Sequence, residues 1–166
     1  AAEVQSVWRG SRALISLPLD DNFAIGGSVR PDASGWNRTA MLNTGPDDTA
    51  NKAMPGISGP YALKLDGVND QIVIADAPDL RLDRFTLSLW VNPAQIKSDW
   101  QPLLIKSDAN SSNRNYALFL VPNTNQVHYF VNKADCTAYA MVNTNTALPL
   151  NAWSHVALTY DGTSLN

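Results

Sequence analysis

The sequence Phe-Thr-Leu-Ser-Leu-Trp-Val-Asn at residues 85–92 alternates strictly between two sets of side chains. Successive side chains of a β-strand point to opposite faces, so one face of this stretch collects the apolar residues Phe85, Leu87, Leu89 and Val91. Pro93 ends the pattern, because proline cannot donate a ladder hydrogen bond. The stretch therefore predicts a half-buried β-strand.

Similar short runs occur on both sides of this strand and are separated by clusters of Gly, Pro, Asn and Asp. Asp66-Gly67 and Asp161-Gly162 are turn sequences of the kind that joins antiparallel strands. The pattern is typical of an all-β protein, and we expect a two-sheet antiparallel β-sandwich of jelly-roll type. The other expected strands are residues 12–17, 61–66, 71–75, 102–106, 115–121, 126–132, 137–142 and 153–160.

Three stretches depart from this pattern. Residues 77–84 contain Pro78 and are compatible with one helical turn. Residues 20–59 show little periodicity, and we expect a long loop that is functional or wrapped over the sheets. The first residues, 1–13, are expected to form an N-terminal arm or extension, and the sandwich itself is expected to span residues 14–166. One domain is expected, because 166 residues suit a single core.

The acidic residues are unevenly divided into fourteen Asp and one Glu. Glu favours helices, whereas Asp favours turns and oxygen-rich cation sites, so a helical bundle and a glycosidase with two catalytic Glu are disfavoured. The formal charge is −3 and no basic cluster is present, which argues against nucleic-acid partners. The longest apolar run, residues 116–121, is too short to span a membrane, so no membrane insertion is expected.

Several segments resemble one known family in order and spacing. The segments are Ala-Leu-Lys-Leu-Asp-Gly-Val-Asn-Asp-Gln-Ile-Val-Ile at 62–74, Phe-Thr-Leu-Ser-Leu-Trp-Val at 85–91, Leu-Ile-Lys at 104–106 and Trp-Ser-His-Val-Ala-Leu-Thr-Tyr-Asp-Gly at 153–162. Asp-Ala-Ser-Gly-Trp-Asn at 32–37 is similar to an early loop of the same family. Together they resemble the laminin G-like, concanavalin A-like lectin domains, which are related to pentraxins.

The resemblance implies a jelly roll that is usually extracellular, binds glycans or proteins and often holds calcium. In that family a further strand follows the Tyr-Asp-Gly turn, whereas this sequence stops at Asn166. We therefore expect the domain to be incomplete at its C-terminus. Ala1-Ala2-Glu3 is compatible with the start left by a signal peptidase, so a secreted or cell-surface location is expected.

The loop at 32–37 is the candidate metal site. Calcium prefers oxygen ligands, which Asp32, the Gly35 carbonyl and Asn37 offer within one short loop, with Asp20 or Asp21 nearby. The resemblance motivates calcium as the cofactor here. The alternative is that this loop is an ordinary turn.

A second candidate site lies in the polar loop at 107–115. Asp108, Asn113 and Asn115 offer oxygens there, and Arg114 offers a guanidinium that pairs with a carboxylate or stacks on a sugar ring. Trp100 lies in a neighbouring polar loop and Trp36 lies in the Asp32 loop, and either is a candidate platform for a sugar. The alternatives are a merely solvated loop and a tryptophan that anchors its loop to the body.

No residue pattern points to catalysis. His155 is expected to be a structural residue, and His128 has no neighbours at metal-ligand spacing. The main hypothesis is a non-catalytic extracellular module that binds a glycan or an extracellular protein. This module is expected to belong to a longer polypeptide. The alternative is a structural subunit that self-assembles into an extracellular or cell-surface assembly, such as a surface layer, filament or shell. The pairing state of the single cysteine, Cys136, stays open.

Overall fold

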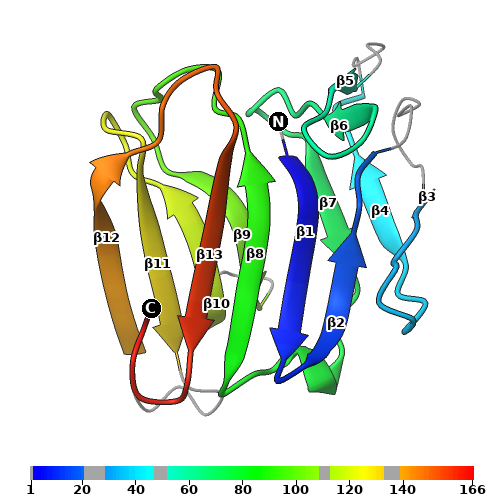
Figure 1. Ribbon diagram of the computed structural model, residues 1–166, viewed down its shortest axis with the longest axis vertical. Helices are drawn as coiled ribbons and strands as arrows, with labels where there is room; N and C mark the ends of the chain where they lie inside the picture. Colours follow the sequence, from blue (N-terminus) through cyan, green and yellow to red (C-terminus); the bar gives the residue numbers. More distant parts are fainter. Residues whose placement is uncertain (1, 21–28, 47–51, 109–112, 133–138) are drawn as a thin grey trace.

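The computed structural model describes residues 2–20, 29–46, 52–108, 113–132 and 139–166, with side chains from Ser6 onward. Asp21, named near the candidate metal site, and Cys136, whose pairing state is open, lie outside the described residues. Every strand pairing among the described residues is antiparallel, and the strands form two layers that pack face to face (Figure 1). The predicted all-β antiparallel sandwich is confirmed.

The first layer is a six-stranded sheet in which β8 (Phe85–Val91) and β1 (Ala2–Arg9) are central. The side chains of β8 alternate between buried and half-buried over their whole length, as the sequence predicts. The order is β13-β8-β1-β6-β5, with β2 also paired to β1. The flanking strands are β2 (Arg12–Leu17), β5 (Ala53–Pro55), β6 (Tyr61–Leu63) and β13 (Ser154–Tyr160).

The second layer consists of two separate sheets. The four-stranded sheet has the order β12-β11-β10-β9, from β9 (Gln101–Ser107), β10 (Arg114–Leu120), β11 (Gln126–Asn132) and β12 (Tyr139–Ala147). The three-stranded sheet has the order β3-β4-β7, from β3 (Val29–Arg30), β4 (Ala40–Asn43) and β7 (Gln71–Ile74). The expected helical turn is the 3-10 helix η1 (Pro78–Leu80).

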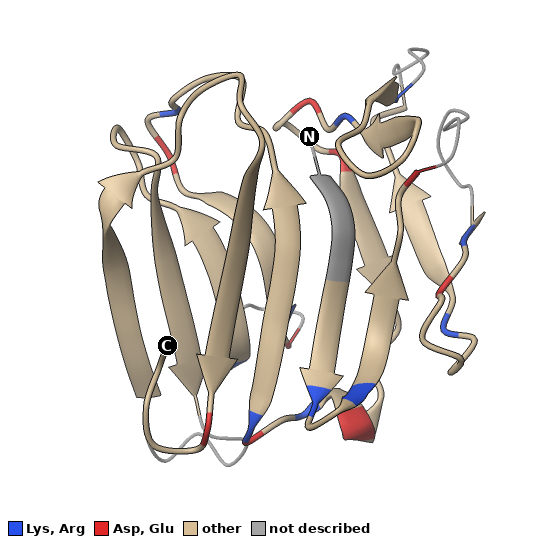
Figure 2. Cartoon of the chain, in the orientation of Figure 1, with Lys and Arg blue, Asp and Glu red and all other residues tan. Residues whose placement is uncertain are grey.

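The core lies between the two layers and is built mainly from leucines. Leu87 and Leu89 of β8 and Leu118 of β10 are fully buried there. The charged residues lie mostly in turns and at strand ends, whereas the strands themselves are almost free of charge (Figure 2). No helix among the described residues is long and apolar enough to cross a membrane.

The N-terminal segment does not follow the expectation of an arm. Its residues form β1, which pairs with β8 on one side and with β2 and β6 on the other. Val7 of β1 is only 2% exposed and belongs to the core. The short stretch before Gly10 shows too few alternations to be recognised as a strand from the sequence.

The expectation of a long irregular loop at residues 20–59 is wrong in its described parts, which contain β3, β4 and β5. These strands have two to four residues, too few for a period of two to be visible. Ala40 and Leu42 of β4 are nevertheless fully buried. The last strand of the four-stranded sheet also extends to Ala147, beyond the expected end at 142.

Candidate functional site

The outer face of the four-stranded sheet carries two rows of aligned side chains. In the first row, Phe119 on β10 lies opposite His128 on β11, and His128 lies opposite Asn143 on β12. In the second row, Phe130 on β11 lies opposite Met141 on β12. These residues alternate with core residues such as Leu118, Leu120, Val127 and Val131, so they point away from the core. We call this surface the aromatic face.

Trp100 covers the first row of the aromatic face. Its ring lies 5.8 Å from the ring of Phe119 and 5.0 Å from that of His128, with an edge-to-face geometry in both cases. Such geometry is favourable for aromatic pairs and fixes the indole over the sheet. Phe119 is only 7% exposed under this cover, whereas Trp100 itself is 46% exposed. The indole is therefore both anchored and accessible.

Polar groups surround these rings. The Arg114 guanidinium lies 5.3 Å from the Phe119 ring centre, a cation–π distance. His128 Nδ1 lies 2.6 Å from the Asn143 side-chain oxygen, so Nδ1 donates this bond. Among the described residues, Arg114 Nε and Asn132 Oδ1 are buried without a hydrogen-bond partner. The face thus combines ring surfaces with donors and acceptors.

The second row extends the apolar surface toward β12. The rings of Phe130 and Tyr139 are nearly parallel, with centres 6.1 Å apart. Tyr139 and Met141 are well exposed. The four strands of this sheet contain neither Asp nor Glu, and Lys106 and Arg114 are their charged residues. The strands themselves therefore offer stacking and hydrogen bonding but no carboxylate.

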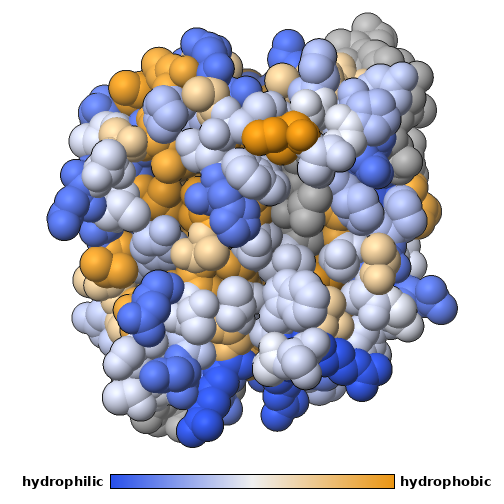
Figure 3. Space-filling view, in the orientation of Figure 1, coloured by the Kyte–Doolittle hydropathy of each residue, from blue (hydrophilic) through white to orange (hydrophobic). Residues whose placement is uncertain are grey.

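The outer face of the first layer differs from the aromatic face in its side chains. It presents small hydroxyl residues that bond to one another, such as Thr86 with Thr159 at 3.2 Å. Ser88 also bonds to the His155 Nε2 at 2.8 Å, which agrees with the structural role expected for that histidine. Figure 3 looks onto this layer, where hydrophobic residues are broken into separate patches among hydrophilic ones. The aromatic face is therefore the stronger candidate for ligand binding.

The Asp32 loop is held by hydrogen bonds from its carboxylate. Asp32 Oδ1 accepts from the backbone N–H groups of Ser16 and Ser34, both at 2.9 Å. Asp32 Oδ2 accepts from the Ser34 hydroxyl at 2.7 Å and from the Arg38 N–H at 3.2 Å. Both carboxylate oxygens are thus used to tie the loop to β2 and to shape its own turn.

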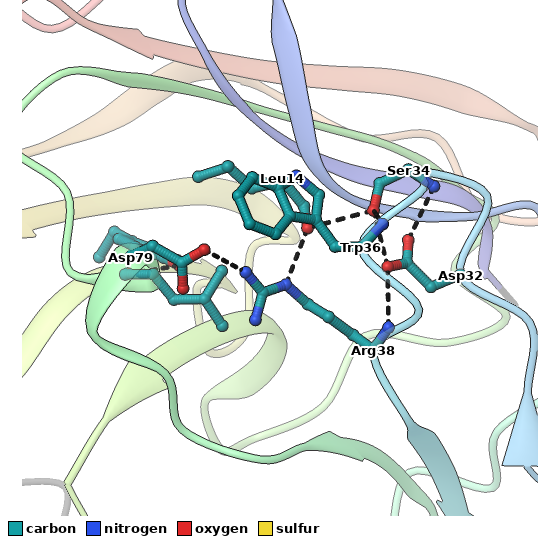
Figure 4. Close-up of polar contacts among 8 residues, drawn as sticks. Leu14, Asp32, Ser34, Trp36, Arg38 and Asp79 are labelled. Carbon is teal, nitrogen blue, oxygen red and sulfur yellow. Dashed lines mark hydrogen bonds and ion pairs between the residues drawn. The ribbon is translucent and has the colours of Figure 1, made fainter.

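Arg38 fixes the other side of this loop (Figure 4). Its Nε donates to the Leu14 carbonyl at 2.9 Å, and its Nη2 pairs with Asp79 of η1 at 2.5 Å. The guanidinium groups of Arg12 and Arg38 lie 4.2 Å and 5.4 Å from the Trp36 ring centre. The loop is therefore an anchored structure with two cations close to its tryptophan.

These contacts do not fit the calcium ligands predicted at Asp32, Gly35 and Asn37. A cation would have to displace N–H and O–H donors from both oxygens of Asp32, beside two arginines. Gly35 and Asn37 have positive φ angles, which is turn geometry. Among the described residues no group of three or more His, Cys, Asp or Glu is placed to hold a metal. Calcium at this loop stays a prediction that the geometry does not favour.

The substitution Asp32→Asn tests the structural role of this carboxylate. Partial burial raises the pKa of Asp32, but the hydrogen bonds from Ser34, Ser16 and Arg38 outweigh it and lower the pKa below 3.8. A lowered pKa stabilises the fold above the unfolded pKa, and that stability is lost as pH falls. We expect D32N to lower the unfolding free energy by about 1–2 kcal/mol at pH 7. Urea unfolding should show this difference shrinking below about pH 4.

Adding or removing calcium tests whether the Asp32 loop binds this ion. With the carboxylate engaged as described, millimolar calcium or a chelator should leave the melting temperature of the unchanged protein where it was. A calcium-dependent rise in melting temperature that D32N abolishes would show that the loop binds calcium after all.

The residues predicted in the 107–115 loop divide into three groups. Arg114 lies on the aromatic face with Trp100, so the structure brings these two together around Phe119. Asn113 donates to Asp108 at 2.9 Å across the base of their loop, whose middle, 109–112, lies outside the described residues.

Asn115 points elsewhere. Its amide accepts from the Leu82 N–H at 2.7 Å and donates to the Leu82 and Asn132 carbonyls at 3.0 Å and 2.8 Å, so it ties β10 to β11 and to the segment before β8. Its side-chain contacts thus go to the backbone of neighbouring segments instead of to the aromatic face. The binding role predicted for Asp108, Asn113 and Asn115 stays a prediction.

Sequence reasoning missed Phe119, His128 and Asn143 as parts of the site. His128 carried one usable signal, because it alternates with Val127 and Tyr129 and so had to face away from the core. Cross-strand alignment with Phe119 and Asn143 depends on the register of three strands, which the sequence pattern does not define.

The two-layer antiparallel architecture defines the class as an antiparallel β-sandwich. A laminin G-like family model, described as the concanavalin A-like lectin/glucanases superfamily, matches residues 66–166, more than half of the chain. The chain therefore belongs to this superfamily, as the resemblance in its motifs predicts. Comparison with curated proteins and with solved structures finds no significant match. Membership in this family suggests a carbohydrate- or protein-binding module.

Proposed function

We propose that the protein is a non-catalytic carbohydrate-binding module that acts outside the cell or on its surface. The aromatic face is its binding surface, and Trp100 is the central contact. The observation that carries the proposal is the anchored and accessible Trp100 ring, which packs against Phe119 and His128.

Sugar rings suit this surface for two reasons. Their C–H faces stack on aromatic rings, and a large ring held in place loses little conformational entropy on binding. Their hydroxyl groups need donors and acceptors, which Arg114, His128 and Asn143 supply beside the rings. Tyr139, at the other end of the face, adds a second exposed ring for a longer oligosaccharide.

The composition of the sheet supports binding without catalysis. Glycoside hydrolysis typically needs two carboxyl groups on either side of the scissile bond. The four strands of the aromatic face contain neither Asp nor Glu, so these strands supply no such pair. Arg114 adds a positive charge, which favours sugars with a carboxylate over cationic sugars.

Trp100→Ala is the direct test of the binding surface. We expect binding to the best ligand from a panel of glucan, xylan, mannan and uronate-containing oligosaccharides to weaken by about tenfold or more, because the stacking surface is lost. Isothermal titration calorimetry measures the affinity. Trp36→Ala is the matched control, since Trp36 is 39% exposed but lies on the Asp32 loop.

Two results would count against the proposal. One is that W36A weakens glycan binding as strongly as W100A does. The other is the absence of binding across the panel at millimolar ligand. In that second case an extracellular protein becomes the preferred partner for the same face.

Self-assembly is a second candidate, favoured by the outer edge of β12. Among the described residues this nine-residue strand ends its sheet, and Tyr139, Met141 and Val142 on it are exposed. Long exposed edges pair readily with other strands. Sedimentation velocity at increasing protein concentration tests self-assembly, because a monomer at all concentrations argues against a structural subunit.

A further inference from the structure

Arg114 brings a positive charge onto the aromatic face. Its guanidinium reaches the Phe119 ring further along β10 and lies 5.3 Å from the ring centre. Ala117 lies between these two residues and alternates with the core residues Tyr116 and Leu118, so it points outward. Ala117 is nevertheless 0% exposed, which fits an Arg114 side chain that lies along the strand over it. The charge is therefore held against the sheet, beside the aromatic rings.

This charge has no counter-charge among the described residues. The four strands contain neither Asp nor Glu, and Lys106, their other charged residue, pairs with Asp76 at 2.6 Å. No described carboxylate forms an ion pair with Arg114, and its Nε is buried without a hydrogen-bond partner there. A half-buried cation has lost part of its hydration, and the Phe119 ring offsets only part of that cost. An anionic group on a ligand therefore supplies the partner that the described fold does not.

Arg38 shows the opposite arrangement for an arginine of the same protein. Its Nε donates to the Leu14 carbonyl at 2.9 Å, its Nη2 pairs with Asp79, and its side chain is 11% exposed. These bonds tie the Asp32 loop to neighbouring segments, so the fold itself accounts for Arg38. Arg114 makes no such ties among the described residues. A ligand, and not the packing of the sandwich, is therefore the better explanation of its position.

The guanidinium and the exposed indole border the same ring. Trp100 lies 5.8 Å and the Arg114 guanidinium 5.3 Å from the centre of the Phe119 ring. A sugar that stacks on Trp100 therefore brings its edge close to the charge. In a uronic acid the carboxylate is joined directly to the sugar ring, so ring and charge form one rigid unit. A planar carboxylate also pairs with a guanidinium through two parallel hydrogen bonds.

We propose that the aromatic face prefers uronate residues, with the sugar ring on Trp100 and the carboxylate on Arg114. Arg114 is then the residue that determines specificity, whereas Trp100 supplies the stacking surface common to all sugars. This preference rests on the proposed function, because it names the class of sugar that the same face selects. Neutral sugars gain the stacking contact alone. Sulfate esters carry charge on a tetrahedral group, which matches the planar guanidinium less well than a carboxylate does.

The probes are short oligomers of galacturonate, glucuronate and mannuronate, each compared with its own methyl ester. The ester keeps the sugar ring and its hydroxyl groups but removes the negative charge. A sulfated glucan oligomer of equal charge supplies an anion without a carboxylate. Isothermal titration calorimetry should show at least one acid form binding more tightly than its ester by about tenfold or more. Added sodium chloride should weaken binding of the acid and not of the ester, because salt screens the charge pair.

Three variants locate the preference on one side chain. Arg114→Met removes the charge but keeps an unbranched stem, so the acid should bind it no more tightly than the ester does. Arg114→Lys keeps the charge without the planar fork, so it should retain only part of the preference. Lys106→Met is the matched control, since that charge is already paired with Asp76, and it should leave the preference unchanged. Circular dichroism shows that each variant is folded, and the comparison of acid with ester in the unchanged protein needs no variant.

Four results would overturn the uronate preference. Equal binding of acid and ester, with W100A still weakening both, would remove the preference and leave the proposed function standing. A preference that R114M keeps or that K106M removes would place the recognition of charge elsewhere. Equal binding of the sulfated oligomer and the acid would indicate attraction between charges without recognition of a carboxylate. Absence of binding by acid, ester and neutral sugar alike would remove the proposed function together with this preference.

Discussion

Leu87→Ala is expected to destabilise the protein by about 3–5 kcal/mol, close to the whole stability of a marginal domain. Leu87 lies in the middle of β8, is 0% exposed, and pairs across the sheet with Val7 of β1 and Leu158 of β13. All three residues face the core, so truncation leaves a cavity that neighbours on three strands cannot easily fill. Equilibrium unfolding in urea, monitored by circular dichroism, measures the loss.

Ser88→Ala is the matched control on the same strand. Ser88 points to the outer face and bonds to His155, so its loss should cost about 0.5–1.5 kcal/mol. Equal effects of the two substitutions would contradict the assignment of one apolar and one polar face to β8, on which the whole sandwich depends.

Lys52→Met is expected to have a comparably large effect, a loss of about 3–5 kcal/mol. Lys52 Nζ lies 2.8 Å from Asp70 Oδ2, and the two side chains are only 6% and 0% exposed. Removal of the lysine leaves the Asp70 carboxylate buried without its main charge partner, which costs more than the ion pair itself contributes. Urea unfolding at pH 7 measures the change.

The double variant K52M/D70N provides the control for this second prediction. The amide introduced at position 70 carries no charge and can still accept the Asp66 N–H bond. The double variant should therefore recover part of the stability that K52M loses. A double variant less stable than K52M would show that the uncompensated charge is not the cause.

The sequence predicted the strands that are long enough to show alternation and are bounded by clear turns. Residues 85–91 and 126–132 are two such cases. β3, β4 and β5 are too short to show a period of two, although Leu42 of β4 is fully buried. Their formation depends on partners far away in the sequence, such as the pairing of β4 with β7.

The candidate site could be predicted only in part. Trp100 and Arg114 were recognised by their residue type in polar loops, and the structure brings both to Phe119. Asn115 follows Arg114 directly, and the register between β9 and β10 shifts between Arg114 and Tyr116. Such an irregularity turns a side chain toward a different face of the sheet, and no sequence pattern predicts it.

The excess of Asp over Glu has a structural explanation among the described turns. Asp66 Oδ1 accepts from the Val68 N–H at 2.8 Å, and Asp161 Oδ1 accepts from the Thr163 and Ser164 N–H groups at 2.8 Å and 2.7 Å. These bonds lower the pKa of both carboxyl groups. The shorter Asp side chain reaches the backbone two or three residues ahead, which is the geometry that these turns use. Turn formation therefore accounts for these two acids, which the sequence also places in turns.

The central claim is that the aromatic face binds carbohydrate, and the tryptophan indole N–H signals in a two-dimensional NMR spectrum test it most directly. Trp8 and Trp90 belong to strands of the first layer, whereas Trp100 covers the second. Titration with the best oligosaccharide should shift the Trp100 signal, assigned through Trp100→Phe, and leave those of Trp8 and Trp90 unmoved. Movement of the Trp8 or Trp90 signal with a stationary Trp100 signal would contradict the account.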